Sequence, residues 1–113
     1  MKFDHIGIPT TEEKKWAAYV EAGKVHVSDP TATPYGIEWL KFEPDSPMHE
    51  LIQNVAHVAF EVDDLDAALK GAKVIVEPFF AMEGVRCAFI DDAGAPIELI
   101  QRKKAGCCCG CGA

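Results

Sequence analysis

Apolar and polar residues alternate along two short stretches that lie about half a chain apart. Residues 3–9 read FDHIGIP, and residues 54–64 read NVAHVAFEVDD. Such alternation is typical of β-strands, in which residues two apart share one face of the sheet. Each stretch carries a histidine near its start, His5 in the first and His57 in the second, and ends at a turn. Two strands with the same pattern indicate a duplicated module.

The alternation also assigns side chains to faces of the first strand. Residues at odd positions would share one face, and those at even positions the other. The first face would hold Phe3, His5 and Gly7, and the second Asp4, Ile6 and Ile8.

The stretch after the first strand has two interpretations. Thr10 with Glu13 three residues later is typical of a helix N-terminus, and Gly23 of a helix end. The apolar face of this helix would be formed by Trp16, Ala17, Tyr19 and Val20. The alternative limits the helix to one or two turns and starts a strand near Tyr19, because a period of two also fits residues 19–27. We prefer the helix.

The rest of the first half is rich in strand and turn signals. Residues 24–27 and 37–42 are predicted strands, and residues 29–34 a loop. Two prolines in residues 43–47 end the second of these strands. Residues 48–53 fit either a short helix or a strand.

The second half begins with the strand of His57 and continues in the same way. Asp63 or Asp64 would cap a helix that ends at Gly71. Three strands follow, at residues 73–76, 85–90 and 96–101, with an interruption at Glu77-Pro78 and a hairpin turn at residues 91–94.

Both halves therefore predict one βαβββ module, the first over about residues 1–53 and the second over about 54–102. Each module is too small to bury its own sheet face, so the two should pair. The expected fold class is α+β, with paired βαβββ modules that form a curved, partly open barrel-like sheet around a cleft. Residues 1–104 would make one domain. Because its core is thin and its sheet edges open, we expect a homodimer.

The composition excludes several classes of partner. The net charge is −7, and the one basic run is residues 102–104, so a nucleic-acid partner is not expected. No apolar run approaches the roughly 20 residues that a membrane span needs, and a membrane partner is not expected either. Hydrophobic residues make up 49% and charged residues 26%, as in ordinary globular proteins.

The five cysteines are unevenly placed. Cys87 lies alone in a predicted strand, whereas the last seven residues hold Cys107, Cys108, Cys109 and Cys111. A disulfide framework would spread its cysteines through the fold, so we expect a reducing, cytoplasmic location. Residues 105–113 are predicted to be a flexible tail, although crowded thiolates could also bind a soft metal ion.

Three motifs resemble one known family. FDHIGIP at the first strand, AHVAFEVDDLDAAL at the central strand and DDAGAPIELIQ at the end resemble the vicinal oxygen chelate superfamily. This superfamily includes glyoxalases, methylmalonyl-CoA epimerases, extradiol dioxygenases and bleomycin resistance proteins. The resemblance covers residues 2–102. It bears on the fold more than on the reaction, because one fold hosts many activities.

The resemblance implies a set of metal ligands. In metal-dependent members the first strand of each module supplies a histidine and the last strand a glutamate, which here match His5, His57 and Glu98. Imidazole and carboxylate suit one divalent ion such as Zn²⁺, Ni²⁺, Co²⁺, Mn²⁺ or Fe²⁺. In isomerase-like members a glutamate beside the ion moves a proton, a catalytic role that Glu98 or Glu38 could take.

Two glutamates compete for the fourth ligand position. The tetrapeptide IEWL around Glu38 resembles IELI around Glu98. The tetrapeptide ELIQ that starts at Glu50 repeats the one at Glu98 letter for letter, at the same spacing after a glycine. Against Glu50, few residues would remain to reach the strand of His57 at about 3.5 Å per residue. We favour Glu38.

The best functional interpretation is a small metal-dependent enzyme of lyase, isomerase or dioxygenase type that acts on a small oxygenated metabolite. One alternative is a metal-free protein that sequesters a small molecule in the same cleft. Another is a metal-handling protein that uses its Cys-rich tail. Trp39, Phe79, Phe80 and Met82 could line a pocket, although core packing is the more common role of such residues.

Overall fold

The computed structural model describes residues 1–103, and the predicted Cys-rich tail lies outside this range. Within the described residues the chain forms eight strands, two short α-helices and two 3₁₀ turns. The elements in order are β1 (Lys2–Pro9), β2 (Ala18–Val20), η1 (Glu21–Gly23), β3 (Val25–Val27), η2 (Pro30–Ala32), β4 (Ile37–Phe42), α1 (Glu50–Asn54), β5 (His57–Glu61), α2 (Leu65–Ala68), β6 (Val74–Met82), β7 (Val85–Asp92) and β8 (Ala95–Arg102). None of the described helices has the length and apolar character needed to cross a membrane.

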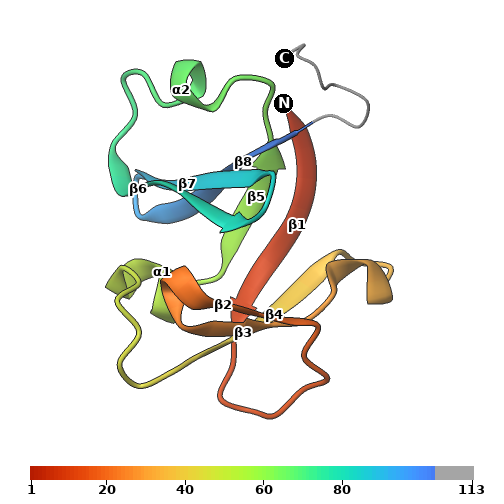
Figure 1. Cartoon of the computed structure of the whole chain (residues 1–113). Helices are drawn as coiled ribbons and strands as arrows, with labels where there is room; N and C mark the ends of the chain where they lie inside the picture. The colour runs from red at the N-terminus through yellow and green to blue at the C-terminus, as the bar shows by residue number, and fades with distance from the viewer. Residues whose placement is uncertain (104–113) are drawn as a thin grey trace.

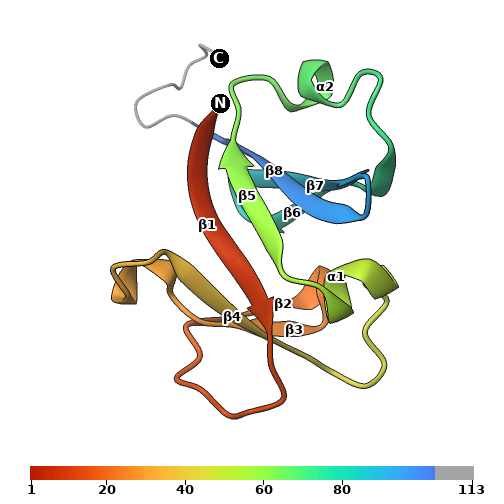
Figure 2. The ribbon, with the colours of Figure 1, turned by 180° about the vertical axis from the view of Figure 1, so that it is seen from behind.

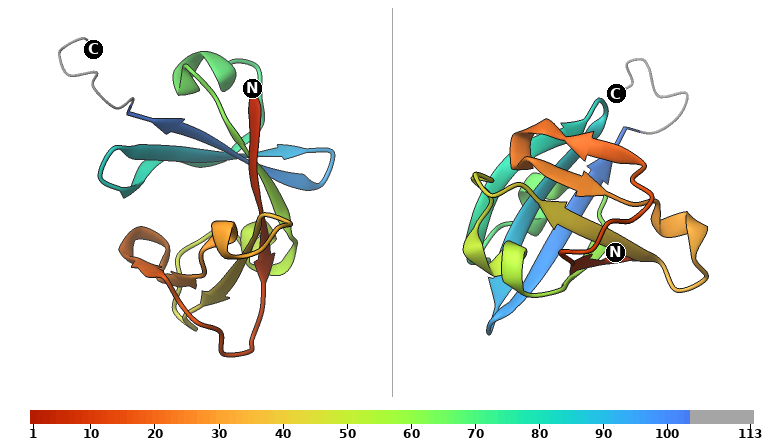
Figure 3. Two further views of the ribbon diagram at one scale, coloured as in Figure 1. Left: turned by 90° about the vertical axis from the view of Figure 1, so that its right-hand side faces the viewer. Right: turned by 90° about the horizontal axis from the view of Figure 1, so that it is seen from below.

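All eight strands belong to one sheet in the order β2-β3-β4-β1-β5-β8-β7-β6. The two central strands, β1 and β5, are antiparallel and run side by side (Figure 2). The first half of the sheet (β1–β4) and the second half (β5–β8) curve toward each other, so the sheet is nearly closed as a barrel (Figure 1). Seen from below, the strands of the first half lie in front of those of the second (Figure 3). The predicted fold class, a curved and partly open barrel-like sheet, is confirmed.

The strand register shows the internal duplication directly. In the first half β1 pairs in parallel with β4, and Gly7 lies opposite Glu38. In the second half β5 pairs in parallel with β8, and Ala59 lies opposite Glu98. The two histidines precede Gly7 and Ala59 by the same two residues. The halves therefore present equivalent side chains at equivalent places.

The helix predicted over residues 10–23 is wrong. Residues 10–17 form no regular element, and the chain then enters strand β2 and the turn η1. From Lys14 to Val20 burial alternates from one residue to the next, which is the period of an extended chain. Ala18 and Val20 pack against the buried cluster that contains Val25, and pairing with β3 satisfies the backbone. Packing thus favoured the alternative, a strand near Tyr19, and the first half lacks the module's helix.

The two short helices begin at side-chain caps. The imidazole Nδ1 of His49 accepts a hydrogen bond from the Leu51 amide at 3.0 Å and starts α1. Of the two alternatives for residues 48–53, the short helix is therefore the one observed, over residues 50–54. Asp64 accepts from the Ala67 amide at 3.2 Å and starts α2, as predicted, but α2 ends at Ala68 and not at Gly71. Leu65 of α2 is fully buried in the outer hydrophobic cluster of the second half.

The predicted break at Glu77-Pro78 does not end a strand. Strand β6 continues through it, but its pairing with β7 shifts register between Val76 and Phe79. A proline is tolerated here because β6 is an edge strand, whose outer amides have no ladder partner.

Candidate metal centre

Four ionisable side chains from four strands meet in the cleft inside the curved sheet. His5 lies on β1, Glu38 on β4, His57 on β5 and Glu98 on β8. Alternation along each strand turns these side chains to the concave face. Glu98 Oε1 lies 3.0 Å from His57 Nε2 and 3.3 Å from His5 Nε2. Glu38 Oε1 lies 3.2 Å from His5 Nε2. The structure thus brings together all four residues of the favoured ligand set.

Glu50 is not part of this cluster. It lies in the first turn of α1, and its side chain is exposed. By contrast, ligand atoms of His5, Glu38 and His57 all lie within 4.8 Å of one another. The register explains the difference, because Glu38 occupies the place in the first half that Glu98 occupies in the second.

Burial and charge together set the protonation of the cluster. Burial alone would lower the pKa of His5, but the carboxylates of Glu38 and Glu98 outweigh it and raise the pKa to about 11. Burial alone would raise the pKa of Glu98, but His5 and His57 outweigh it and lower the pKa to about 2. Without an ion, a proton on His5 therefore balances carboxylates in the cleft.

The donor atoms fit a divalent cation. His5 Nε2 is buried and has no hydrogen-bond partner of good geometry among the described residues, although it faces two carboxylate oxygens. A cation between these atoms would meet two imidazoles and two carboxylates, which suit borderline metals such as Zn²⁺, Co²⁺ or Fe²⁺. The cation would also balance the charge of the carboxylates in place of the proton on His5.

Asp4 orients His5 from behind, which the sequence pattern did not predict. Its Oδ2 accepts a hydrogen bond from His5 Nδ1 at 2.7 Å, and Arg102 donates to both Asp4 oxygens at 2.7 and 3.3 Å. Burial would raise the pKa of Asp4, but Arg102 and His5 outweigh it and lower the pKa. A proton held on Nδ1 leaves Nε2 facing the cluster, as in many metal-binding histidines.

A bulge in β1 makes the Asp4 contact possible. The pairing of β1 with β5 shifts register between Phe3 and His5. Phe3 therefore packs against Phe60 on the opposite face and is 48% exposed, so its predicted place beside His5 is wrong. A strict period of two cannot reveal such a shift.

We expect the substitution Asp4→Asn to weaken metal binding about 10- to 100-fold, the usual cost of losing a carboxylate behind a ligand histidine. The dissociation constant of Co²⁺ would be measured by competition with a chelator. Asp66→Asn is a matched control, because Asp66 forms a similar pair with Arg86 at 3.0 Å on the exposed surface. Equal affinities for wild type and Asp4→Asn would show that Asp4 does not orient His5.

Gly7 makes room for His57, and the sequence pattern did not predict this role either. The two residues lie opposite each other on β1 and β5. A Cβ at Gly7 would lie 2.1 Å from Cε1 and 2.4 Å from Nε2 of the His57 ring, far inside van der Waals contact. A glycine inside a strand pattern is the signal that could have indicated this close approach.

The cleft around the cluster is small and mostly apolar. Its volume is about 110 Å³. Phe79 and Met82 line it, although core packing was the favoured expectation for both. Trp39 lies under Lys14 outside the cleft, and Phe80 is 64% exposed. Cys87 is buried against the cleft. Burial raises the pKa of its thiol most, and the nearby carboxylate of Glu98 raises it further. The thiol therefore stays protonated at neutral pH.

Comparison with known proteins identifies the family. The family model of the Glyoxalase/Bleomycin resistance protein/Dioxygenase superfamily matches residues 3–99, a range that contains all four residues of the cluster. The chain belongs to this superfamily. A search of curated proteins found no match.

Two solved structures show the same fold as this superfamily member. A hypothetical protein from Bacillus halodurans C-125 aligns with a TM-score of 0.67 and 22% identity, over 93% of this chain and 96% of that one. Methylmalonyl-CoA epimerase from Mycobacterium tuberculosis aligns with a TM-score of 0.60 and 17% identity, over 91% of this chain and 89% of that one. At these identities the similarity shows the fold and not the reaction. The glyoxalase superfamily as a whole typically binds a metal ion and small-molecule substrates.

Proposed function

We propose that this glyoxalase-superfamily protein is a metal-dependent enzyme of lyase, isomerase or dioxygenase type that acts on a small oxygenated metabolite. The observation that carries the proposal is the convergence of His5, Glu38, His57 and Glu98 in one buried cleft. A divalent ion held there would supply Lewis acidity toward substrate oxygens.

Glu38 is the better placed of the two carboxylates to move a proton. The carboxylate of Glu98 contacts both His5 and His57, whereas that of Glu38 contacts His5. The side chain of Glu38 is 19% exposed against 11% for Glu98, so Glu38 has the easier access to a ligand. A cleft of about 110 Å³ holds about four waters at roughly 30 Å³ each, which suits a small oxygenated group.

Metal binding tests the proposal. We expect one divalent ion per chain, and His57→Ala or Glu98→Ala should abolish binding where wild type is saturated. Glu38→Gln should weaken binding strongly and Glu50→Gln hardly at all, because Glu50 is exposed on α1. At a free-ion concentration a hundredfold above the dissociation constant, the ion should add about 2.7 kcal/mol to the free energy of unfolding. Chelator should remove this gain from wild type and leave the stability of His57→Ala unchanged. Metal analysis, calorimetry and thermal melts measure these effects.

Two results would redirect the assignment. Wild type that binds none of Zn²⁺, Ni²⁺, Co²⁺, Mn²⁺ and Fe²⁺ would favour the metal-free binding protein. Metal that is lost when residues 105–113 are deleted would favour the metal-handling interpretation. The homodimer, which light scattering would test, and the cytoplasmic location stay predictions.

A further inference from the structure

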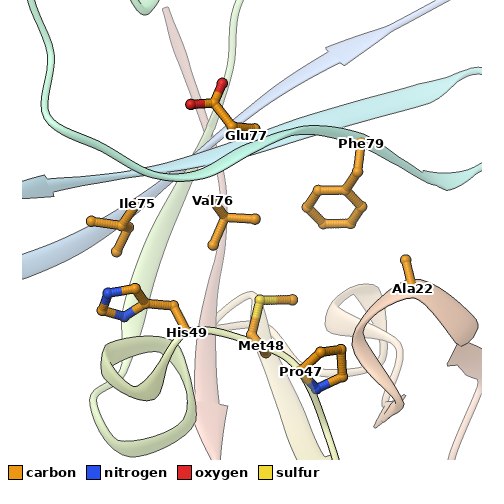
Figure 4. Close-up of a pocket in the computed structure, with 8 residues that line it drawn as sticks. All are labelled: Ala22, Pro47, Met48, His49, Ile75, Val76, Glu77 and Phe79. Atoms are coloured by element: carbon orange, nitrogen blue, oxygen red, sulfur yellow. The ribbon is translucent and has the colours of Figure 1, made fainter.

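A second cavity opens beside the metal cleft, where the two edges of the curved sheet approach each other. We call it the vestibule; it has a volume of about 380 Å³. Ala22, Pro47, Met48 and His49 of the first half form one wall, and Ile75, Val76 and Phe79 of β6 form the other (Figure 4).

The vestibule and the metal cleft share part of their lining. Met48 and Phe79 line both cavities. The two cavities are therefore adjacent, with the side chains of Met48 and Phe79 between them. The cleft alone is smaller than ligand pockets usually are, whereas the two spaces together reach the range of about 300–1,000 Å³ typical of such pockets.

The chemistry of the vestibule walls favours an apolar occupant. Most of the side chains in Figure 4 that face each other across the gap are aliphatic or aromatic, whereas the carboxylate of Glu77 points away from it. His49 Nδ1 already accepts the Leu51 amide. Among the described residues that line the vestibule none is lysine or arginine, so it lacks the permanent positive charges with which proteins usually bind a phosphate.

We propose that the vestibule is the subsite for an apolar tail, aliphatic or aromatic, of the same ligand whose oxygenated head binds in the metal cleft. This inference rests on the proposed function. It narrows the substrate class to molecules with an oxygenated group at one end and a hydrocarbon group at the other. Met48 and Phe79, which stand between the two spaces, would limit the width of the molecule at the junction.

A series of straight-chain hydroxamic acids tests the subsite. Hydroxamates chelate divalent ions through two adjacent oxygens, so Co²⁺-loaded protein would be titrated with members from acetohydroxamic to octanohydroxamic acid. We expect affinity to rise up to about fourfold for each added CH₂ that is fully buried, until the vestibule is filled. The visible spectrum of Co²⁺ reports binding of the head group, and calorimetry gives the affinity of each member.

Two tryptophan variants show where the alkyl chain lies. Val76→Trp would fill the vestibule. It should remove the increase of affinity with chain length and leave the affinity for acetohydroxamic acid, which has no long alkyl chain, unchanged. Phe80→Trp is the matched control, because Phe80 lies on the same strand but is exposed and lines neither cavity. If Val76→Trp does not fold, Ala22→Trp makes the same test from the opposite wall, because Ala22 lines the vestibule and not the metal cleft.

The outcomes separate this inference from the proposed function. Affinity that does not depend on chain length in wild type, or equal losses in the two tryptophan variants, would overturn the subsite alone. Protein that takes up no Co²⁺ would overturn the proposed function, and the subsite with it.

Discussion

Replacing Gly7 with alanine should abolish metal binding at the candidate site without changing any of its four candidate ligands. The new Cβ would lie 2.1 Å from the His57 ring, so the imidazole must leave its position. Losing a ligand should cost more than about 100-fold in metal affinity, since weakening a group behind a ligand already costs 10- to 100-fold. Gly7 is not among the residues with positive φ, so steric overlap with His57 is the expected cause. Calorimetry with Zn²⁺ and the spectrum of Co²⁺ would measure the loss.

A double-mutant cycle attributes the effect of Gly7→Ala to His57. Overpacking should destabilise the single variant by about 1–3 kcal/mol, and most of this cost should vanish in the His57→Ala background, where the ring is absent. Gly71→Ala is a control for stability alone, because Gly71 has positive φ and no neighbour within 4 Å of an added Cβ. Additive costs of the two substitutions would contradict the explanation.

The tetrapeptide ELIQ shows why the sequence alone offered two candidates for the fourth ligand position. Its first copy, which begins at Glu50, lies entirely in helix α1, and its second copy, which begins at Glu98, lies in strand β8. The cap at His49 begins a helix at the first copy, whereas β5 and β7 pair with the second. Context outside a short segment thus overrides its local preference.

Alternation along single strands was informative where the partner strand kept its register. The strands predicted around His5 and His57 are present, and these two side chains line the cleft. That they share a site with Glu98 was implied by the family resemblance and not by alternation. Alternation misplaced Phe3, where β1 shifts register against β5, and it missed the contact of Asp4 with His5. These features depend on a neighbouring strand some fifty residues away, so a pattern along one strand does not contain them.

The failed helix over residues 10–23 has the same kind of cause. The cap signal at Thr10 and the stop signal at Gly23 are local, but the Ala17 amide donates to the Val27 carbonyl at 2.8 Å and draws the chain into the sheet. Lys14 lies over the Trp39 ring at 4.5 Å, so the extended segment also covers β4. Tertiary contacts therefore outweighed the helix signals.

Metal-free protein should lose stability as the pH rises from 6.5 to 8.5. The pKa of His5 is about 11 in the folded chain and about 6.5 in the unfolded chain, so the folded state keeps a proton that the unfolded state releases. The stabilisation is fully present below pH 6.5 and declines toward pH 11, by about 1.4 kcal/mol per pH unit. Over this window the loss should be about 2 kcal/mol, because the slope develops fully only above pH 6.5. Urea unfolding in the presence of chelator would measure it.

Controls for the pH dependence follow from the same cluster. The pKa of Glu98 is lowered to about 2, so its contribution is lost only in acid and stays constant between pH 6.5 and 8.5. The variant His5→Gln cannot hold the proton and should show a much flatter profile. Saturating Zn²⁺ should also flatten the wild-type profile, because a metal-bound imidazole carries no such proton in the folded state. A flat profile for metal-free wild type would show that His5 is neutral in the folded chain, and the carboxylates in the cleft would then need another counter-charge.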